Sequence, residues 1–532
     1  MNHIELFAGC GGLSLGLDKA DFKLVMANEL SPMAAETFAY NFLNENLEEI
    51  ANNGGKPNQS YWLNSQFSDL KSRLRENPFN SPSFSSGEGF SDIPKDLNEL
   101  QGKLVIGSIV ELNKLLEKTP ELVEKLQDAF GDGGLDLVSG GPPCQSFSMA
   151  GLRKKDCDKN SLPWEFAKFV SHVRPKIAVL ENVTGILRAF KDDEGNSFHA
   201  WFEVAKVFAT KGYIPLCLHI NARLAGVAQN RPRFIMIAIR EDIYDLLAIN
   251  FKSDSTESKL FKLSESFFQA VKMDVESVKF GSIPYFDATK PADFALYKNS
   301  FLHHLVSREE VSVCEALDDL KQKKPSSPSK FVKNLNKTFS NSLKKREGEI
   351  PNNEQRNNSE IVKRRFRLYQ VLQQIDNRSV TKAVFAILKG SDTQLDDNIW
   401  NEVKEYCYLK ESGKLELFLN KESFITYLLS HPTKKQTQKA LAPNSPAPAA
   451  LSIPDDACHY DEDELRVLTV REMARIQSFP DNFVFRSKVT TGGQMRKFEV
   501  PQYTQVGNAV PPLLGLALGK VIKDLLNSKC DS

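Results

Sequence analysis

The chain has 532 residues, 41% of them hydrophobic, which suits two to four ordinary domains or one large domain with an insertion. Its 68 lysines and arginines balance 68 aspartates and glutamates, which excludes a uniformly basic coat for nucleic acid but not a local basic patch. The eight cysteines form no CxxC pair and no zinc-type cluster, and no apolar run reaches the roughly 20 residues that span a bilayer, so we expect no metal site and no membrane segment.

Seven short apolar runs alternate with helical stretches over the first 240 residues. Such runs are typical of strands that are buried on both faces. Their alternation with helices predicts an α/β fold in which helices cover a parallel sheet. The expected strands are residues 2–7, 23–29, 102–109, 135–140, 176–183, 213–222 and 233–240.

Three segments interrupt this pattern. Residues 44–100 are rich in Asn, Ser, Gly and Pro, which indicates a surface insertion that is partly mobile. Residues 321–370 carry 14 basic and 4 acidic side chains, a local net charge of +10, with aromatic residues interleaved in "KRRFRLYQ". This basic run is either a solvated face or a surface that contacts phosphates. Residues 442–454 have the Pro/Ala-rich composition of a linker.

A strand leads into a glycine-rich bend and then a helix at "FAGCGGLSLG", residues 7–16. Gly9 and Gly11 can adopt backbone angles closed to other residues, and they let a ligand approach the main chain. The bend lacks the Gly-Lys-Ser/Thr of a phosphate-binding loop. Glu29 ends the second expected strand, where a carboxylate can accept both ribose hydroxyls of an adenosine cofactor. The alternative role for Glu29 is to cap the following helix.

The segment "GGPPCQSFS" places Cys144 just beyond the carboxyl end of a buried strand, the edge at which open α/β sheets bind ligands. Pro142 and Pro143 fix two backbone angles and deny helix to the residues before them, so the thiol is held in position. This frame favours a nucleophile over a packing cysteine. Because a free thiol is only a few per cent ionised at neutral pH, the site must raise the thiolate fraction or offer a good electrophile.

Polar side chains also mark the later strand ends. Glu181 and Asn182 end an otherwise apolar run, and partial burial would make Glu181 a proton donor; the alternative is a helix N-cap acid. Arg231 and Arg233 lead into the last strand, where residues two apart share a face, so both guanidinium groups could enter one cleft. An exposed pair at the strand end is the other possibility for these arginines.

Six segments together resemble the DNA cytosine carbon-5 methyltransferase family, over roughly residues 1–240 and 456–525. They are "FAGCGG", "PPCQSFS", "ENV", "QNRPR", "RVLTVREMARIQSFP" and "QVGNAVPP", in this order. The resemblance implies a Rossmann-like methyltransferase sheet with helices on both faces, plus a smaller target-recognition domain. The implied divisions are a catalytic cofactor-binding domain at 1–250 with the insertion at 44–100, a target-recognition region at 251–495 that includes "RVLTVREMARIQSFP", and a return to the catalytic domain at 496–532.

The same resemblance implies that methyl passes from S-adenosylmethionine to carbon 5 of a flipped-out cytosine in a specific double-stranded DNA sequence, through a covalent adduct with Cys144. Glu181 would contact ring nitrogen 3 and the amino group, and Arg233, with Arg231, would steady the base or the catalytic loop. The implied cofactor residues are Phe7, Gly9, Gly11, Glu29, Ser108, Asn508 and Val510. The basic run offers Lys363, Arg364, Arg365 and Arg367 for phosphate contacts.

A family member of this kind would be a modification methylase of the bacterial cytoplasm, associated with the nucleoid. A cognate restriction endonuclease is the functional partner such an enzyme can have, and the sequence leaves open whether one accompanies it. The chain departs from the usual family pattern at three positions. Ser108 stands where an acid is usual, although Glu111 could compensate; Leu30 stands where an aromatic residue often stacks on adenine; and Ala228 replaces a common proline.

Three other functions stay open on the sequence. The same chemistry could act on RNA, although the long basic run and "QSFS" after "PPC" favour DNA. A non-catalytic nucleic-acid-binding protein could use this scaffold, but the intact Cys144, Glu181 and Arg233 argue against that. A nicotinamide-dependent oxidoreductase is supported by the glycine-rich bend alone.

Overall fold

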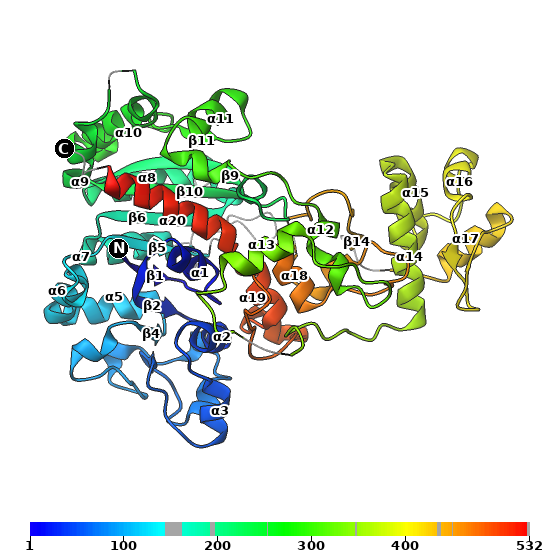
Figure 1. Ribbon diagram of the computed structural model, residues 1–532, viewed down its shortest axis with the longest axis horizontal. Helices are drawn as coiled ribbons and strands as arrows, with labels where there is room; N and C mark the ends of the chain where they lie inside the picture. Colours follow the sequence, from blue (N-terminus) through cyan, green and yellow to red (C-terminus); the bar gives the residue numbers. More distant parts are fainter. Residues whose placement is uncertain are drawn as a thin grey trace.

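The computed structural model describes residues 1–143, 162–191, 197–252, 254–345, 348–433, 438–449 and 451–528. Two bodies of unequal size lie along the long axis of the molecule (Figure 1). The larger body holds the main sheet, the first strand and the last helix, and the smaller body is built around helices α14 to α17. Each body has a hydrophobic core cluster of its own.

The main sheet has nine strands in the order β11-β9-β10-β6-β5-β1-β2-β4-β3. All seven strands expected from the sequence are present. Strand β10 runs antiparallel to both of its neighbours, so the predicted parallel sheet is in fact mixed; an apolar run does not carry the direction of its strand. The strands are β1 Asn2–Leu6, β2 Lys23–Glu29, β3 Ser60–Trp62, β4 Lys103–Ile106, β5 Leu137–Gly140, β6 Ile177–Val183, β9 Tyr213–Asn221, β10 Pro232–Arg240 and β11 Tyr285–Asp287.

Helices cover both faces of this sheet. One face carries α1 Gly12–Lys19, α2 Pro32–Phe42 and α20 Pro512–Asn527; the other carries α5 Ile109–Lys118, α7 Leu162–Val173 and α8 Ala200–Thr210. Further helices of the larger body are α6 Pro120–Gln127, α9 Glu241–Ala248, α10 Thr256–Met273 and α11 Pro291–Lys298. Among the described residues, no helix combines the length and apolar character that crossing a membrane requires.

The last helix returns to the start of the chain. Helices α1 and α20 pack at backbone distance, because a Cβ on Gly16 would lie 2.3 Å from the backbone nitrogen of Leu516. Gly519 likewise faces Ala20, whose Cβ would be 2.5 Å from an added Cβ. Glycines at this crossing therefore let the C-terminal segment lie directly beside the glycine-rich bend.

The insertion at residues 44–100 folds at the edge of the sheet, and its partial mobility stays a prediction. It contributes strand β3 and a small core in which Trp62, Leu70 and Leu74 pack with Phe38 of α2. Its apolar residues are too few and too scattered to give a period, which is why the sequence did not predict this fold. Its helices are α3 Leu47–Asn52, α4 Leu70–Arg73, η1 Pro78–Asn80, η2 Phe84–Ser86 and η3 Leu97–Leu100.

The cores divide residues 251–495 differently from the division drawn on the sequence. Residues 360–433 build most of the smaller body, with α14 Glu360–Ile375, α15 Arg378–Leu388, α16 Asp397–Val403 and α17 Lys421–Leu429; its core also includes Ala440, Cys458 and Val467. Helix α18, Val470–Ile476, packs into the larger core together with α12 Val313–Leu317. Motif order along the chain does not reveal which core a segment joins.

The Pro/Ala-rich residues 442–454 were expected to be a linker, yet their described part lies against the larger body. The N–H of Ala447 donates to the carbonyl of Ala228 at 2.9 Å, and the N–H of Asn230 donates to the carbonyl of Ala447 at 2.8 Å. Ala447 and Leu451 are buried. Proline-rich composition thus marks an extended strap that is bonded to the segment before β10.

Candidate active site

The glycine-rich turn between β1 and α1 forms the first part of the site. Phe7, Gly9 and Gly11 have backbone φ angles of 55°, 57° and 93°. This left-handed conformation is unusual for a residue such as Phe7, and strained residues of this kind cluster at ligand sites. A Cβ added to Gly9 would meet no atom within 4 Å, so the turn leaves space for a ligand at its backbone.

The carboxylate of Glu29 is fixed beside this turn. Its Oε2 accepts the N–H of Gly9 at 2.7 Å, and its Oε1 accepts the N–H of Ser31 at 2.7 Å. Burial raises the pKa of the Glu29 carboxyl, and the two backbone N–H groups oppose that rise. The side chain that caps α2 is Ser31, which accepts the N–H of Ala34. Glu29 therefore keeps lone pairs that can accept ligand hydroxyl groups.

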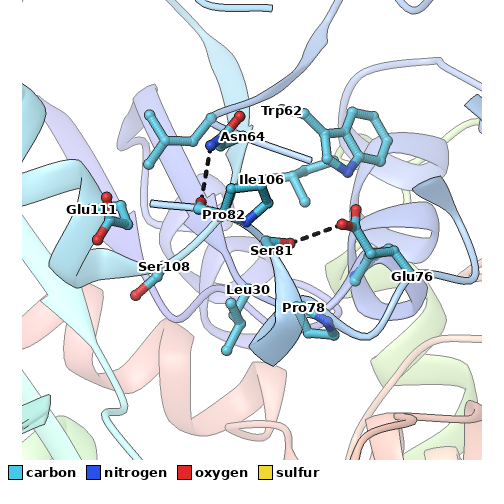
Figure 2. Close-up of a pocket in the computed structure, with 13 residues that line it drawn as sticks. Leu30, Trp62, Asn64, Glu76, Pro78, Ser81, Pro82, Ile106, Ser108 and Glu111 are labelled. Atoms are coloured by element: carbon cyan, nitrogen blue, oxygen red, sulfur yellow. Dashed lines mark hydrogen bonds between the residues drawn. The ribbon is translucent and has the colours of Figure 1, made fainter. Parts of the chain in front are cut away.

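A pocket lies at the carboxyl ends of β2, β3 and β4, and its lining includes Leu30, the residue after Glu29 (Figure 2). Leu30, Ile106 and Ser108 line one part of it. Ser108 is the N-cap of α5, and its Oγ accepts the N–H of Val110 at 3.2 Å. The hydroxyl proton of Ser108 stays available for a ligand acceptor.

Glu111 also lines this pocket, but its carboxylate serves another purpose. Its Oε2 accepts the Oγ–H of Ser83 and the N–H of Phe84, both at 2.8 Å, and its Oε1 accepts from Lys114 at 2.7 Å. Glu111 therefore anchors the insertion to α5.

The C-terminal loop closes over the glycine-rich turn. The carbonyl oxygen of Val510 would lie 2.2 Å from a Cβ on Gly12, so only glycine fits under it. Asn508 ends helix α19, Gln502–Asn508, and is exposed. Gln505 ties this helix to α2, because its Oε1 accepts from Thr37 at 2.6 Å. Asn508 and Val510 therefore lie at the same sheet edge as Glu29.

The second part of the site lies at the ends of β5 and β6. Gly141 passes against Glu181, whose Oε2 would be 3.0 Å from a Cβ at that glycine. The Nε of Arg233 lies 2.6 Å from Oε1 of Glu181, and the two side chains are 10% and 11% exposed. Nearby, the amide of Asn182 donates to the carbonyl of Pro142 at 3.0 Å. A nearly buried ion pair is thus locked beside the Gly-Pro-Pro segment.

Cys144 lies outside the described residues, which stop at Pro143 and resume at Leu162. The described chain therefore leads up to the predicted nucleophile at the position of the Glu181–Arg233 pair.

Arg231 and Arg233 serve different parts of the site. Arg231 is buried, and its Nη2 donates to the carbonyls of Gly507 at 2.7 Å and Ala509 at 3.0 Å. Burial, with the neighbouring Arg233, lowers the pKa of the Arg231 guanidinium. Arg231 thus holds the C-terminal loop, while Arg233 holds Glu181.

The four cations predicted to contact DNA all lie on helix α14, in different surroundings. Arg367 is only 4% exposed; its Nε donates to the carbonyl of Cys407 at 2.9 Å, and its Nη2 lies 3.2 Å from Glu462. Lys363 has a side chain that is 39% exposed and faces Glu360 at 2.8 Å. Burial of Arg367 makes it a packing residue of the smaller body.

The other two cations, Arg364 and Arg365, each have one partner within the smaller body. Arg364 lies 3.6 Å from Glu411, and Arg365 donates to the carbonyl of Pro432 at 2.8 Å. The interleaved aromatic residues Phe366 and Tyr369 are 1% and 2% exposed, in the core of the smaller body. The aromatic spacing in "KRRFRLYQ" therefore reflects helix packing.

The motif around α18 is a buried ionic network in the larger body. Arg475 pairs with Asp319 at 2.5 Å and with Asp481 at 2.7 Å, and its side chain is 1% exposed. Glu472 accepts from Arg466 and from the N–H of Thr469, each at 2.8 Å. The Arg475–Asp319 pair joins segments 156 residues apart in the sequence, so "REMARIQSFP" takes part in the packing of the larger body.

The sequence profile of C-5 cytosine-specific DNA methylases matches residues 1–61 and 113–524 of this chain. The fold and the sheet-edge site are those of an α/β methyltransferase, and the chain belongs to the C-5 cytosine-specific DNA methylase family. It is therefore a DNA cytosine-5 methyltransferase.

Individual relatives are distant. The type II methyltransferase M.Bpa9945I of Bacillus paralicheniformis is 25% identical over 98% of this chain and 99% of its own length. The type II methyltransferase M.DdeI of Desulfomicrobium norvegicum is 24% identical over 98% of this chain and 88% of its own. The solved structure of the S. pombe Dnmt2 methyltransferase is similar with a TM-score of 0.38 and 15% identity, over 99% of both chains.

Sequence reasoning missed the residues that the insertion places at the pocket, Trp62 and Leu63 above all. The local signal was slight, since "SYWL" is a short apolar run within a stretch of turn-forming residues. It also missed Gly12 and Gln505, whose roles depend on contacts with segments hundreds of residues away.

Proposed function

We propose that this protein is a sequence-specific modification methylase that uses S-adenosylmethionine and forms a covalent adduct between Cys144 and the target cytosine. The observation that carries the proposal is the Glu181–Arg233 ion pair beside Gly141 and Pro142. A paired carboxylate at that depth is costly to bury unless the pairing is close, so its placement at an open sheet edge indicates a chemical role.

The cofactor site is assigned to the turn and strand ends that surround Glu29. S-adenosylmethionine supplies a methyl group on a positively charged sulfur, which makes that methyl electrophilic. Phe7, Gly9 and Gly11 shape the backbone against which it lies, and Glu29 accepts the ribose hydroxyls. Ser108 donates to the nucleoside, and Asn508 with Val510 covers the turn. The free space at Gly9 and the spare lone pairs of Glu29 support this fit.

The reaction begins when the thiolate of Cys144 adds to carbon 6 of the cytosine ring. Glu181 supplies a proton to ring nitrogen 3, so that the electron pair released by the addition accumulates at carbon 5. Carbon 5 would then bond to the methyl group that the cofactor supplies, and its own proton would leave to solvent. Elimination of the Cys144 thiolate from carbon 6, with return of the nitrogen 3 proton to Glu181, would restore the aromatic ring. Arg233 orients Glu181 throughout, while Arg231 is a positioning residue for the C-terminal loop.

The target base must leave the duplex before Cys144 can reach its ring, at a cost of a few kcal/mol. Phosphate contacts offset that cost, and Lys363, Arg364 and Arg365, which are all partly exposed, are assigned to them. The buried Arg367 is left out of this assignment. A cognate restriction endonuclease is the functional partner proposed for the enzyme, because the relatives named above are type II methyltransferases.

Methyl transfer to defined DNA tests the proposal. Purified protein is incubated with tritiated S-adenosylmethionine and either unmodified duplex DNA, the same duplex with every cytosine already methylated at carbon 5, or transfer RNA. We expect label in unmodified duplex only, recovered as 5-methylcytosine within one short sequence. Label in transfer RNA alone, or in the fully methylated duplex, would contradict the proposal.

A further inference from the structure

The insertion supplies one wall of the pocket beside Glu29 (Figure 2). The opposite lining comes from the sheet edge, at Leu30, Pro32, Ile106, Gly107, Ser108 and Glu111. The wall from the insertion consists of Trp62, Leu63, Asn64, Glu76, Pro78, Ser81 and Pro82, and we call it the insertion wall. The pocket is therefore a joint product of the sheet and of a segment that the family profile does not match.

Strand β3 fixes the insertion wall to the sheet. It pairs in parallel with β4, with Trp62 opposite Ile106, and the N–H of Leu63 donates to the carbonyl of Ile106 at 2.8 Å. A Cβ on Gly107 would lie 2.7 Å from the Cβ of Leu63, so the two backbones approach as closely as glycine allows. The wall cannot be displaced without breaking sheet hydrogen bonds.

Buried polar contacts brace the wall from within. Glu76 accepts from Ser65 at 2.6 Å through Oε2 and from Ser81 at 3.0 Å through Oε1. The amide of Asn64 donates to the carbonyl of Pro82 at 2.9 Å, and Figure 2 shows both contacts at Ser81 and Pro82. These bonds hold the loop that follows α4 in one conformation.

Two further contacts attach the wall to the helices that flank the cofactor edge. Glu111 of α5 accepts from Ser83 and Phe84, both at 2.8 Å. Arg75 pairs with the buried Glu36 of α2 at 2.6 Å. The insertion is thus bound on both sides of the pocket, as expected of a functional part of the site.

The lining combines flat apolar surface with a few hydrogen-bonding groups. Leu30, Ile106 and Pro82 are apolar, and Ser108 offers a hydroxyl. Trp62 is 1% exposed, and its Nε1–H has no hydrogen-bond partner among the described residues. Because a buried unpaired donor is costly, its presence in a pocket wall indicates that a ligand acceptor completes it. A planar heteroaromatic ring has both the apolar faces and the acceptor edge that this lining suits.

We propose that the insertion wall is the adenine-binding wall of the cofactor site, with the Nε1–H of Trp62 donating to a ring nitrogen of the purine. The inference rests on the proposed function, which puts the ribose at Glu29, one residue before Leu30. It gives a role to residues 60–82 and explains how the chain manages with Leu30 in place of an aromatic residue and Ser108 in place of an acid.

Two variants test the wall, with one matched control. Trp62→Phe removes the donor and keeps an aromatic ring in the core, and Ser81→Leu fills the pocket from the wall. Tyr61→Phe is the control, because Tyr61 is the next residue on β3, points to the other side of the strand and is absent from the lining. Glu29→Gln serves as the reference for the ribose end.

The probes are S-adenosylhomocysteine and S-ribosylhomocysteine, which lacks the adenine, and binding to the full-length protein is measured by titration calorimetry. Trp62→Phe should weaken S-adenosylhomocysteine binding about five- to tenfold, as expected for one lost hydrogen bond, and Ser81→Leu should weaken it at least as much. Neither variant should change the affinity for S-ribosylhomocysteine, and Tyr61→Phe should change neither affinity.

The pattern of losses separates the outcomes. Unchanged binding of S-adenosylhomocysteine by both wall variants, with loss in Glu29→Gln, would overturn the adenine wall and leave the proposed cofactor site intact. Equal losses for both probes in the wall variants would also overturn it, since they would indicate general distortion. If Glu29→Gln binds both probes as the wild type does, the ribose assignment fails, and the proposed function with it.

Discussion

At the carboxyl edge of the sheet, charged side chains are held by groups at neighbouring strand ends, whereas on helix α14 they are held by whichever segment packs alongside. Glu29 accepts two backbone N–H groups, and Glu181 lies against Gly141 with Arg233 as its partner. On α14, Arg365 reaches Pro432 and Arg367 reaches Cys407, two residues from unrelated loops.

This difference explains which charged residues in a sequence are evidence for a functional site. A strand end delivers a side chain to a shared edge, so residues that follow different strands meet in one place. A helix turns about 100° per residue, so adjacent cations such as Arg364 and Arg365 enter different environments. Charge at a strand end is therefore evidence for a site, while a charge run on a helix predicts a surface only after its partners are known.

The largest effect is expected at the strand-end pair. Glu181→Gln should lower kcat by about 10²–10⁴ because the amide cannot supply the proton at nitrogen 3, while the affinity for cofactor stays within about twofold. Steady-state kinetics with duplex DNA measures this. Glu121→Gln, an exposed carboxylate on α6, is the control and should retain full activity. Wild-type kcat in Glu181→Gln would refute the assigned role.

An intermediate effect separates two cations four residues apart on α14. Arg367→Ala should lower the free energy of unfolding by about 1–3 kcal/mol, because a buried side chain and its bond to Cys407 are lost. Lys363→Ala should change it by less than about 0.5 kcal/mol, but should reduce the salt dependence of DNA binding by about one phosphate contact. Denaturant unfolding gives the free energy of unfolding, and DNA binding at several salt concentrations gives the salt dependence. Equal effects of the two substitutions would erase the distinction between helix and strand-end charges.

A smaller, pH-dependent effect is expected beneath the glycine-rich turn. Burial raises the pKa of Glu5 to about 8, against the opposing hydrogen bond from Ser14. Between its unfolded pKa near 4.5 and about 8, folded Glu5 keeps a proton that the unfolded chain releases, so the free energy of unfolding should fall as pH rises through this window. For Glu5→Gln, the free energy of unfolding should fall less steeply between pH 6 and 8, as measured by thermal unfolding at fixed ionic strength. Parallel curves for the two proteins would show that Glu5 does not titrate there.

Much of the sheet and its edge could be predicted because the signals are local. Apolar runs indicated the seven central strands, the glycine-rich bend pointed to Gly9, and carboxylates at strand ends pointed to Glu29 and Glu181. The direction of β10 could not be predicted from the sequence, because a strand buried on both faces has the same apolar run whether it is parallel or antiparallel to its neighbours. The roles of Trp62 and Arg367 could not be read either, because both depend on partners brought in by the tertiary fold.

Trapping with a fluorinated substrate tests the covalent step most directly. Duplex DNA with 5-fluorocytosine in place of cytosine is incubated with the enzyme and S-adenosylmethionine, then separated by denaturing electrophoresis. Since fluorine cannot leave carbon 5 as a proton does, the wild type should remain bonded to the DNA, and Cys144→Ser should bind the DNA without a stable adduct. A denaturation-resistant complex with Cys144→Ser, or none with a wild type that methylates ordinary DNA, would contradict the nucleophilic role of Cys144.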